Sequence, residues 1–433
     1  MLEKIKKMHF RNSNSSLRVC YTLILISLLF FPLTIFSQKA KEKILIPYNN
    51  STNWGFSNYN GKIIIECQYD FVNLFRNGYA RIGIDDKQGL IDEVGNYKIK
   101  PIYDEVINFI NGRAFVKSDS IWQCLDTNLN EIFKINVDKI GIFVHDLALI
   151  RKQSKYGVIN RNGLLILSPE YEELIILKNT FRLKKENFWG VLNHNNDTLL
   201  PFEYDSLSSD NEEVIFTLNG NHFTLRDTSN QKISKYEFMD IGSFVDGLAP
   251  VKIDNKWGFI DKKGKIKIKP QFDAANYFLE DKAAVSKNYK WGYIDKKGRE
   301  LTPIIYERAF NFNEDRATVA SVSPGMRELT IKGEKVKLYS SDYEYYLINE
   351  KFEKIEMETY QYINHVFGGV AIFMEFNKQG LMDKNGKILV KAKYLEITPM
   401  KNNLYIVKRS SGNYRKPYFG YMNSDGFEYF KIE

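Results

Sequence analysis

Residues that could bind a phosphate occur at one place in the chain, in a segment rich in lysine and glycine. The segment from Gly258 to Lys265 (GFIDKKGK) is similar in outline to a phosphate-binding loop. However, five residues separate its two glycines instead of four, and Ile266 stands where a Ser or Thr would hold magnesium. Asp followed by Gly at this spacing is typical of a hairpin turn. We therefore interpret the segment as a turn.

Metal ligands and nucleophiles form no recognisable pattern. Asp126, Asn128 and Asn130 have the spacing of a calcium loop, but Glu131 follows them where Gly is required, and Val137 replaces the bidentate Glu. No two histidines beyond residue 37 are close enough in sequence for a zinc motif, and no Ser or Cys lies in a nucleophile motif. The sequence thus predicts no metal, no cofactor and no catalytic residue.

Positive charge is concentrated in one segment. Residues 252 to 299 contain 13 Lys and Arg against 6 Asp and Glu, a net charge of +7. Alternate residues of a strand share a face, so a strand after Gly264 would present several lysines together. The pattern favours a solvated strand face whose charge prevents edge pairing. The alternative is contact with an anionic envelope polymer, lipid head groups or an acidic partner through Lys263, Lys265, Lys267, Lys269, Lys297 and Arg299.

The charged segment belongs to an internal repeat of 34 residues. KWGFIDKKGKIKIKPQFD (256 to 273) recurs as KWGYIDKKGRELTPIIYE (290 to 307). Equivalent positions, spaced by 33 to 35 residues, are Trp54, Gln88, Trp122, Tyr156, Trp189, His222, Trp257 and Trp291. Further units at Tyr345, Gln379 and Phe419 make eleven, provided that about 20 extra residues lie within 320 to 342.

Each unit carries the same marks. A Gly commonly follows the anchor, and an aromatic residue commonly stands fifteen positions after it. We assign the role of structural repeat anchors to Trp54, Gly55, Trp122, Trp189, Gly190, Trp257, Gly258, Trp291 and Gly292. The tryptophans could also form a row for stacking on sugars, but their fixed phase favours packing between strands or units.

This pattern resembles the bacterial WG-repeat family, also seen as KWG repeats, over roughly residues 44 to 433. The resemblance implies an exported or surface β-repeat protein. It implies an architecture rather than a reaction.

The elements of one unit are predicted to be short antiparallel strands. Trp257 to Ile260 and Ile266 to Ile268 flank the turn as a hairpin, and a segment such as Ala249 to Val251 supplies another strand. No unit can bury its aromatic residues alone, so neighbours must stack. The fold class is therefore all-β, a tandem array of about eleven units. Because propellers usually have four to eight longer blades, we favour an open curved array over a β-propeller-like ring or two propellers.

The N-terminal segment has the features of a signal peptide. Five Lys and Arg against one Glu precede the uncharged run from Cys20 to Phe36, and cleavage after Ser37 would leave Gln38 at the N-terminus. An uncleaved anchor is the alternative, and it would be the chain's contact with a membrane. Without residues 1–37 the chain keeps 56 Lys and Arg against 52 Asp and Glu, so its net charge falls from +8 to +4. No nucleic-acid partner is therefore expected.

Residues 38–433 are expected to form the repeat domain of an exported protein, located in the periplasm, on the cell surface or outside the cell. The predicted function is that of a non-enzymatic scaffold that binds a protein or an anionic glycan of the cell envelope. The alternative is a hydrolase that acts on a polysaccharide in a groove formed across repeats, with paired carboxylates as its requirement.

Overall fold

The computed structural model describes residues 44–208, 213–322, 326–331, 334–339, 343–410 and 417–431, with side chains described outside 323–342. The chain divides into a short unit, Met1–Ile35, and a large unit, Phe36–Glu433. The predicted signal segment 1–37 lies outside the described residues. Among those residues, no helix is long and apolar enough to cross a membrane.

The large unit consists of small antiparallel sheets, which we call blades and number along the chain. Blades 1 to 5 contain β1 (Ile46–Asn49), β2 (Trp54–Ser57) and β3 (Ile63–Tyr69); β4 (Phe71–Val72), β5 (Tyr79–Ile84), β6 (Lys87–Asp92) and β7 (Tyr97–Tyr103); β8 (Glu105–Ile110), β9 (Arg113–Ser118), β10 (Ile121–Leu125) and β11 (Glu131–Asn136); β12 (Lys139–Val144), β13 (Leu147–Lys152), β14 (Lys155–Asn160) and β15 (Leu165–Tyr171); β16 (Glu173–Ile176), β17 (Thr180–Lys185), β18 (Phe188–Asn193) and β19 (Thr198–Tyr204).

Blades 6 to 11 continue the series with the same strand order. They contain β20 (Ser206–Leu207), β21 (Val214–Asn219) and β22 (His222–Asp227); β23 (Asp240–Ile241), β24 (Leu248–Ile253), β25 (Lys256–Asp261) and β26 (Ile266–Phe272); β27 (Ala274–Ala275), β28 (Lys282–Lys287) and β29 (Lys290–Asp295); β30 (Arg308–Ala309), β31 (Arg316–Val322) and β34 (Tyr343–Asn349); β35 (Tyr362–Ile363), β36 (Val370–Glu375), β37 (Lys378–Asp383) and β38 (Ile388–Tyr394); β39 (Glu396–Pro399), β40 (Leu404–Arg409) and β41 (Tyr418–Asn423), with the short 3₁₀ helix η2 (Lys401–Asn403).

The turn that the repeat predicts is held by one side chain. In blade 7, the Asp261 carboxylate accepts hydrogen bonds from the backbone N–H groups of Lys263 (3.0 Å) and Lys265 (2.9 Å), and Gly264 has a φ of +74°. The same pair of bonds forms in every blade, accepted by Asn58, Asp92, Asp126, Asn160, Asn193, Asp227, Asp261, Asp295, Asn349, Asp383 and Asn423. Asn and Asp recur because their short side chains can close this turn.

The Gly after the anchor marks a bulge. Trp257 lies directly opposite Phe272 in the β25–β26 ladder, and the register shifts between Trp257 and Phe259. A Cβ on Gly258 would lie 2.5 Å from the carbonyl oxygen of Ile268. The aromatic residue fifteen positions after the anchor is therefore the cross-strand partner of the anchor. At the Gly that follows the anchor, the backbone of the neighbouring strand passes too close for a side chain.

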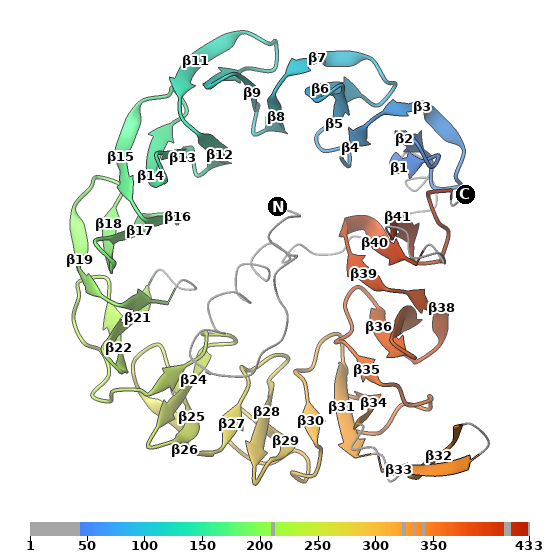
Figure 1. Cartoon of the computed structure of the whole chain (residues 1–433). Coiled ribbons are helices and arrows are strands. Elements are labelled where there is room, and N and C mark those ends of the chain that lie inside the picture. Colours follow the sequence, from blue (N-terminus) through green and yellow to red (C-terminus); the bar gives the residue numbers. More distant parts are fainter. Residues whose placement is uncertain are drawn as a thin grey trace. The chain divides into compact units, whose positions relative to one another are not determined.

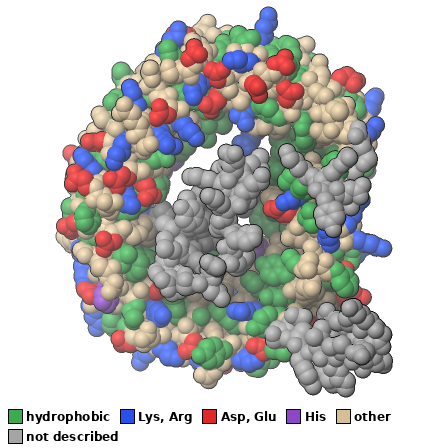
Figure 2. Space-filling view, in the orientation of Figure 1, with side chains coloured by type: hydrophobic (Ala, Val, Ile, Leu, Met, Phe, Trp, Pro, Cys, Tyr) green, Lys and Arg blue, Asp and Glu red, His purple; other side chains and the backbone are tan. Residues whose placement is uncertain are grey.

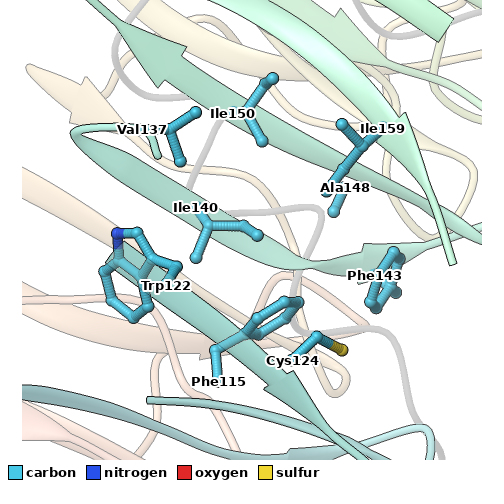
Figure 3. Packing of buried hydrophobic residues seen from close by; sticks show 9 residues of the cluster. All are labelled: Phe115, Trp122, Cys124, Val137, Ile140, Phe143, Ala148, Ile150 and Ile159. Atoms are coloured by element: carbon cyan, nitrogen blue, oxygen red, sulfur yellow. The ribbon is translucent and has the colours of Figure 1, made fainter. Parts of the chain in front are cut away.

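The hydrophobic core is divided among the interfaces between blades. One cluster joins Phe115, Trp122 and Cys124 of blade 3 to residues of blade 4 that include Ile140 and Phe143 (Figure 3). Turn glycines add to these contacts, since Gly298 of blade 8 faces the Ile268 side chain of blade 7. Both faces of a blade thus depend on neighbours.

The first and last blades meet, so the large unit is a closed ring (Figure 1). The Asn49 N–H donates to the Tyr429 carbonyl (3.2 Å), and the Lys431 N–H donates to the Asn49 carbonyl (3.0 Å). Gly61 of blade 1 faces the Phe427 side chain of blade 11, as Gly298 of blade 8 faces a side chain of blade 7. The Tyr59 hydroxyl donates to Asp425 (2.8 Å). Burial and this bond raise the pKa of Tyr59 to about 12, so the donor stays protonated at neutral pH.

The structure is an eleven-bladed β-propeller, and the favoured open array is wrong. The 34-residue period predicted the repeated antiparallel sheets correctly, but both the number and the length of the units were compared with those of propellers that have fewer and longer blades. The angle between neighbours depends on the volumes of side chains at the inner and outer edges of each interface, and no single repeat encodes it. The extra residues within 320 to 342 form a separate hairpin, β32 (Met326–Ile331) and β33 (Glu334–Tyr339), between the paired strands β31 and β34 of blade 9.

The close approach at the bulge leads to a stability prediction. The substitution Gly258→Ala should lower the free energy of unfolding by about 1–3 kcal/mol, because the new methyl group overlaps backbone atoms that cannot move without breaking the β25–β26 ladder. The matched control is Gly141→Ala, where the nearest atom to the Cβ would lie 3.4 Å away. The control should change stability by less than about 1 kcal/mol. Urea unfolding measures both, and equal losses would contradict the role assigned to Gly258.

Candidate functional site

The candidate surface is a rim formed by the turns between the third and fourth strand positions of the blades. The first and fourth residues of each turn maintain its backbone, as in Asp261 and Gly264. The third residue is exposed in all eleven turns, and it varies: Asn60, Val94, Asn128, Asn162, Asn195, Ser229, Lys263, Lys297, Lys351, Asn385 and Asp425. We call these eleven positions the turn rim. They place side chains of different chemistry on one repeated frame.

The predicted basic contacts divide into free and paired groups. Lys263 and Lys297 occupy the same rim position in blades 7 and 8, and both are exposed. Lys265 and Lys269 are also exposed, and none of these four lysines has a carboxylate partner among the described residues. By contrast, Lys267 pairs with Asp261 (3.3 Å), and Arg299 pairs with Asp295 (2.6 Å).

The paired lysine is neutralised by the carboxylate of its own turn. Partial burial acts to raise the pKa of Asp261, but hydrogen bonds from Lys265, Lys267 and Lys263 outweigh burial and hold the pKa below its usual range. The carboxylate is therefore ionised at neutral pH. Neighbouring lysines are neutralised in the same way, since Lys262 lies 2.9 Å from Glu213 and Lys296 lies 2.6 Å from Asp281. Figure 2 shows Lys and Arg interspersed with Asp and Glu over the visible face.

The structure places the five tryptophans in two environments. Trp122 is 2% exposed, inside the cluster between blades 3 and 4 (Figure 3). Its indole nitrogen has no hydrogen-bond partner among the described residues. The other four are half-buried, and each lies opposite an aromatic residue: Trp54 with Tyr69, Trp189 with Tyr204, Trp257 with Phe272, and Trp291 with Tyr306.

The acidic residues of the repeat are engaged in structural bonds. Asp126, the first residue of the calcium-like pattern, accepts the N–H groups of Asn128 (2.9 Å) and Asn130 (2.8 Å). Asp273 pairs with Lys256 (2.5 Å) and accepts the Asn288 N–H (2.6 Å). The hydrogen bond from Lys256 is the largest of the effects that lower the pKa of Asp273. No group of three or more metal-ligating side chains occurs in the part of the chain that the structure describes.

One carboxyl that the sequence analysis missed differs from the others. Burial raises the pKa of Asp240, although its bond to the Ile241 N–H (2.9 Å) and the charge of Lys252 act against the rise. A raised pKa is what a general acid requires. Asp240 has no repeated counterpart in the sequence marks, so only its burial identifies it.

The repeated turn, bulge and aromatic pair occur in segments that match a known protein family. The model of the WG containing repeat matches residues 54–87, 89–122, 156–176, 189–221, 227–257, 257–291, 291–320 and 380–414, more than half of the chain. The chain belongs to this family. Its WG-repeat units include the two copies around Trp257 and Trp291. No match begins at the anchors Trp122 and Tyr345, where Gln123 and Tyr346 stand in place of the Gly.

Comparisons with proteins outside the family do not indicate a function for this chain. A search of curated proteins found no match. Among solved structures, the WG-repeat propeller is similar to a eukaryotic initiation factor (TM-score 0.41, 10% identity, 82% of this chain and 95% of that chain). It is also similar to Hsv2p of Kluyveromyces lactis (0.31, 9%, 66% and 97%) and to PorZ of Porphyromonas gingivalis, a surface component of the type-IX secretion system (0.23, 12%, 88% and 65%).

The two tryptophan environments predict different costs of truncation. Trp122→Ala should lower the free energy of unfolding by about 3–5 kcal/mol, because it removes a fully buried indole from the interface between blades 3 and 4. Trp257→Ala should cost less, because the Trp257 side chain is already partly exposed to solvent. Urea unfolding followed by far-UV circular dichroism would measure both losses. A larger loss for Trp257 would contradict this assignment.

Proposed function

We propose that this WG-repeat propeller is a non-enzymatic binding scaffold that contacts an anionic glycan through the turn rim of blades 7 and 8. The observation that carries the proposal is that different residues of each turn maintain its backbone and face the solvent. Backbone-directed bonds to the first residue and the positive φ of the fourth leave the third residue exposed and free to vary. A surface of this kind changes its ligand without changing its fold.

The four free lysines give this rim its local charge. Lys263 and Lys297 are equivalent in neighbouring blades. Lys269 lies on β26, the fourth strand of blade 7, and Lys265 directly precedes this strand. Such spacing suits an extended polyanion that passes across both blades. The expected location of such a ligand is the cell envelope, consistent with the signal segment predicted from the sequence.

The alternative function, a polysaccharide hydrolase, has one specific observation in its favour. Asp240 combines burial with a raised pKa, as a general acid does. Hydrolysis also needs a second carboxylate at about 5–9.5 Å from the first. Among the described residues, Asp240 is bonded to the Ile241 N–H and interacts with the charge of Lys252, and neither of these is a carboxylate. We therefore prefer binding to hydrolysis.

The test of the binding function replaces the free lysines. The variant Lys263→Gln, Lys265→Gln, Lys269→Gln, Lys297→Gln should lose binding to immobilised polygalacturonate, and neither it nor the parent protein should bind uncharged dextran. Binding of the parent protein should weaken steeply with salt, because the Debye length falls from about 10 Å at 0.1 M to about 3 Å at 1 M. Exposed substitutions of this kind change stability by less than about 0.5 kcal/mol each.

The matched control removes the same number of exposed lysines elsewhere. The variant Lys100→Gln, Lys152→Gln, Lys387→Gln, Lys391→Gln has the same net charge, and these lysines also have no ion-pair partner among the described side chains. It should keep most of the binding. Equal loss in both variants would indicate a general charge effect and would refute a site on blades 7 and 8.

A further inference from the structure

A pocket of about 350 Å³ lies between blades 2 and 3, away from the basic segment. Its lining comes from three places: the β4–β5 turn and β5, the end of β8 with the β8–β9 turn, and the β10–β11 turn. The lining residues are Asn77, Tyr79, Phe109, Asn111, Gly112 and Thr127. The volume is within the range of small-molecule sites, about 300–1,000 Å³. None of the lining side chains is charged.

One side of the pocket is aromatic. The ring of Tyr79 packs against that of Phe109, with centroids 5.3 Å apart and an angle of 49° between planes. Phe109 is almost fully buried, whereas Tyr79 is half-buried and therefore supplies most of the available aromatic surface. The Asn108 amide donates to the Tyr79 carbonyl (2.7 Å) and so fixes the backbone beneath this ring.

The other sides carry polar atoms that the protein does not use. The Asn77 amide nitrogen donates to the Phe109 carbonyl (2.8 Å), and the Asn111 amide nitrogen donates to the Phe143 carbonyl (3.5 Å). These bonds orient both side chains but leave their Oδ1 atoms without a protein partner in the described structure. The hydroxyls of Tyr79 and Thr127 likewise have no partner there.

We propose that this pocket binds one uncharged sugar ring of a glycan. A pyranose presents an apolar face of C–H groups, which packs on an aromatic ring, and an edge of hydroxyls that both donate and accept hydrogen bonds. Tyr79 meets the first requirement. Two amide oxygens, which accept, and two hydroxyls, which donate or accept, meet the second. A charged ligand would find no counter-ion among the lining side chains.

The equivalent place between blades 8 and 9 supports this specificity by contrast. There, Lys282 stands in the position of Tyr79, and its ammonium lies 4.9 Å from the ring centroid of Phe312, the counterpart of Phe109. Glu280 replaces Asn77, and its carboxylate accepts the Asp315 N–H (3.2 Å). The same backbone frame therefore holds a charged, self-satisfied cluster at blades 8 and 9, and an open, uncharged pocket at blades 2 and 3.

The experiment uses saturation-transfer difference NMR on residues 38–433 with uncharged trisaccharides of glucose, mannose, xylose and N-acetylglucosamine as probes. We expect transfer to the ring C–H protons of at least one probe. The variants Tyr79→Lys and Asn111→Glu, which copy residues of the blade 8–9 interface, should each weaken that binding by about tenfold or more. Lys282 and Glu314 occupy the equivalent positions between blades 8 and 9. Urea unfolding of both variants, followed by far-UV circular dichroism, separates loss of binding from loss of the fold.

The control variant is Tyr289→Ala, which removes a 91% exposed aromatic ring from a turn of blade 8. It should leave trisaccharide binding unchanged. The proposal fails if no trisaccharide binds, if Tyr79→Lys binds as well as the parent protein, or if Tyr289→Ala abolishes binding. The quadruple lysine variant should bind trisaccharides normally, so failure of the rim proposal and failure of the pocket proposal are distinguishable.

Discussion

Every blade of this propeller has two apolar faces, and neither can be left in water. Clusters such as the one around Phe115 and Ile140 bury residues from two consecutive blades, so each sheet is stable only between two others. In an open array the outer faces of the first and last blades would stay uncovered. Ring closure removes that cost. Contacts between blades 11 and 1 accordingly close the ring, with Phe427 facing Gly61 and hydrogen bonds linking Asn49 to Tyr429 and Lys431.

This constraint explains how much of the fold the sequence could predict. The Asx turn, the bulge at the anchor Gly and the aromatic pair fifteen residues apart are local. The turn recurs in every blade and the other two features leave a mark in most units, as around Asp261, Gly258 and Phe272. Closure is not local. It arises from small differences in side-chain volume summed over eleven interfaces, and a blade count judged against smaller propellers led to the wrong preference.

The candidate sites show the same limit. The basic segment was visible as composition, but the pairing of Lys267 with Asp261 depends on the hairpin register. Together with the Arg299–Asp295 pair, it reduces the six predicted basic contacts to four. The pocket between blades 2 and 3 was missed because Tyr79 and Asn111 occupy turn positions whose residue varies from unit to unit, with Lys282 and Glu314 at the equivalent positions of blades 8 and 9, so neither carries a repeat mark. In a repeat protein the invariant positions build the frame, so a search for function should begin with residues that interrupt the pattern.

The most direct test of the account is a distance measurement across the closure. Spin labels would be attached at Asn60 and Asp425, which occupy the third turn position in blades 1 and 11, after replacement of Cys67 and Cys124. A reference protein would carry labels at Asn60 and Val94, the same positions in consecutive blades 1 and 2. A closed ring predicts that double electron–electron resonance gives the same short distance for both pairs. A much longer distance for Asn60 and Asp425 would contradict closure and with it the eleven-bladed propeller.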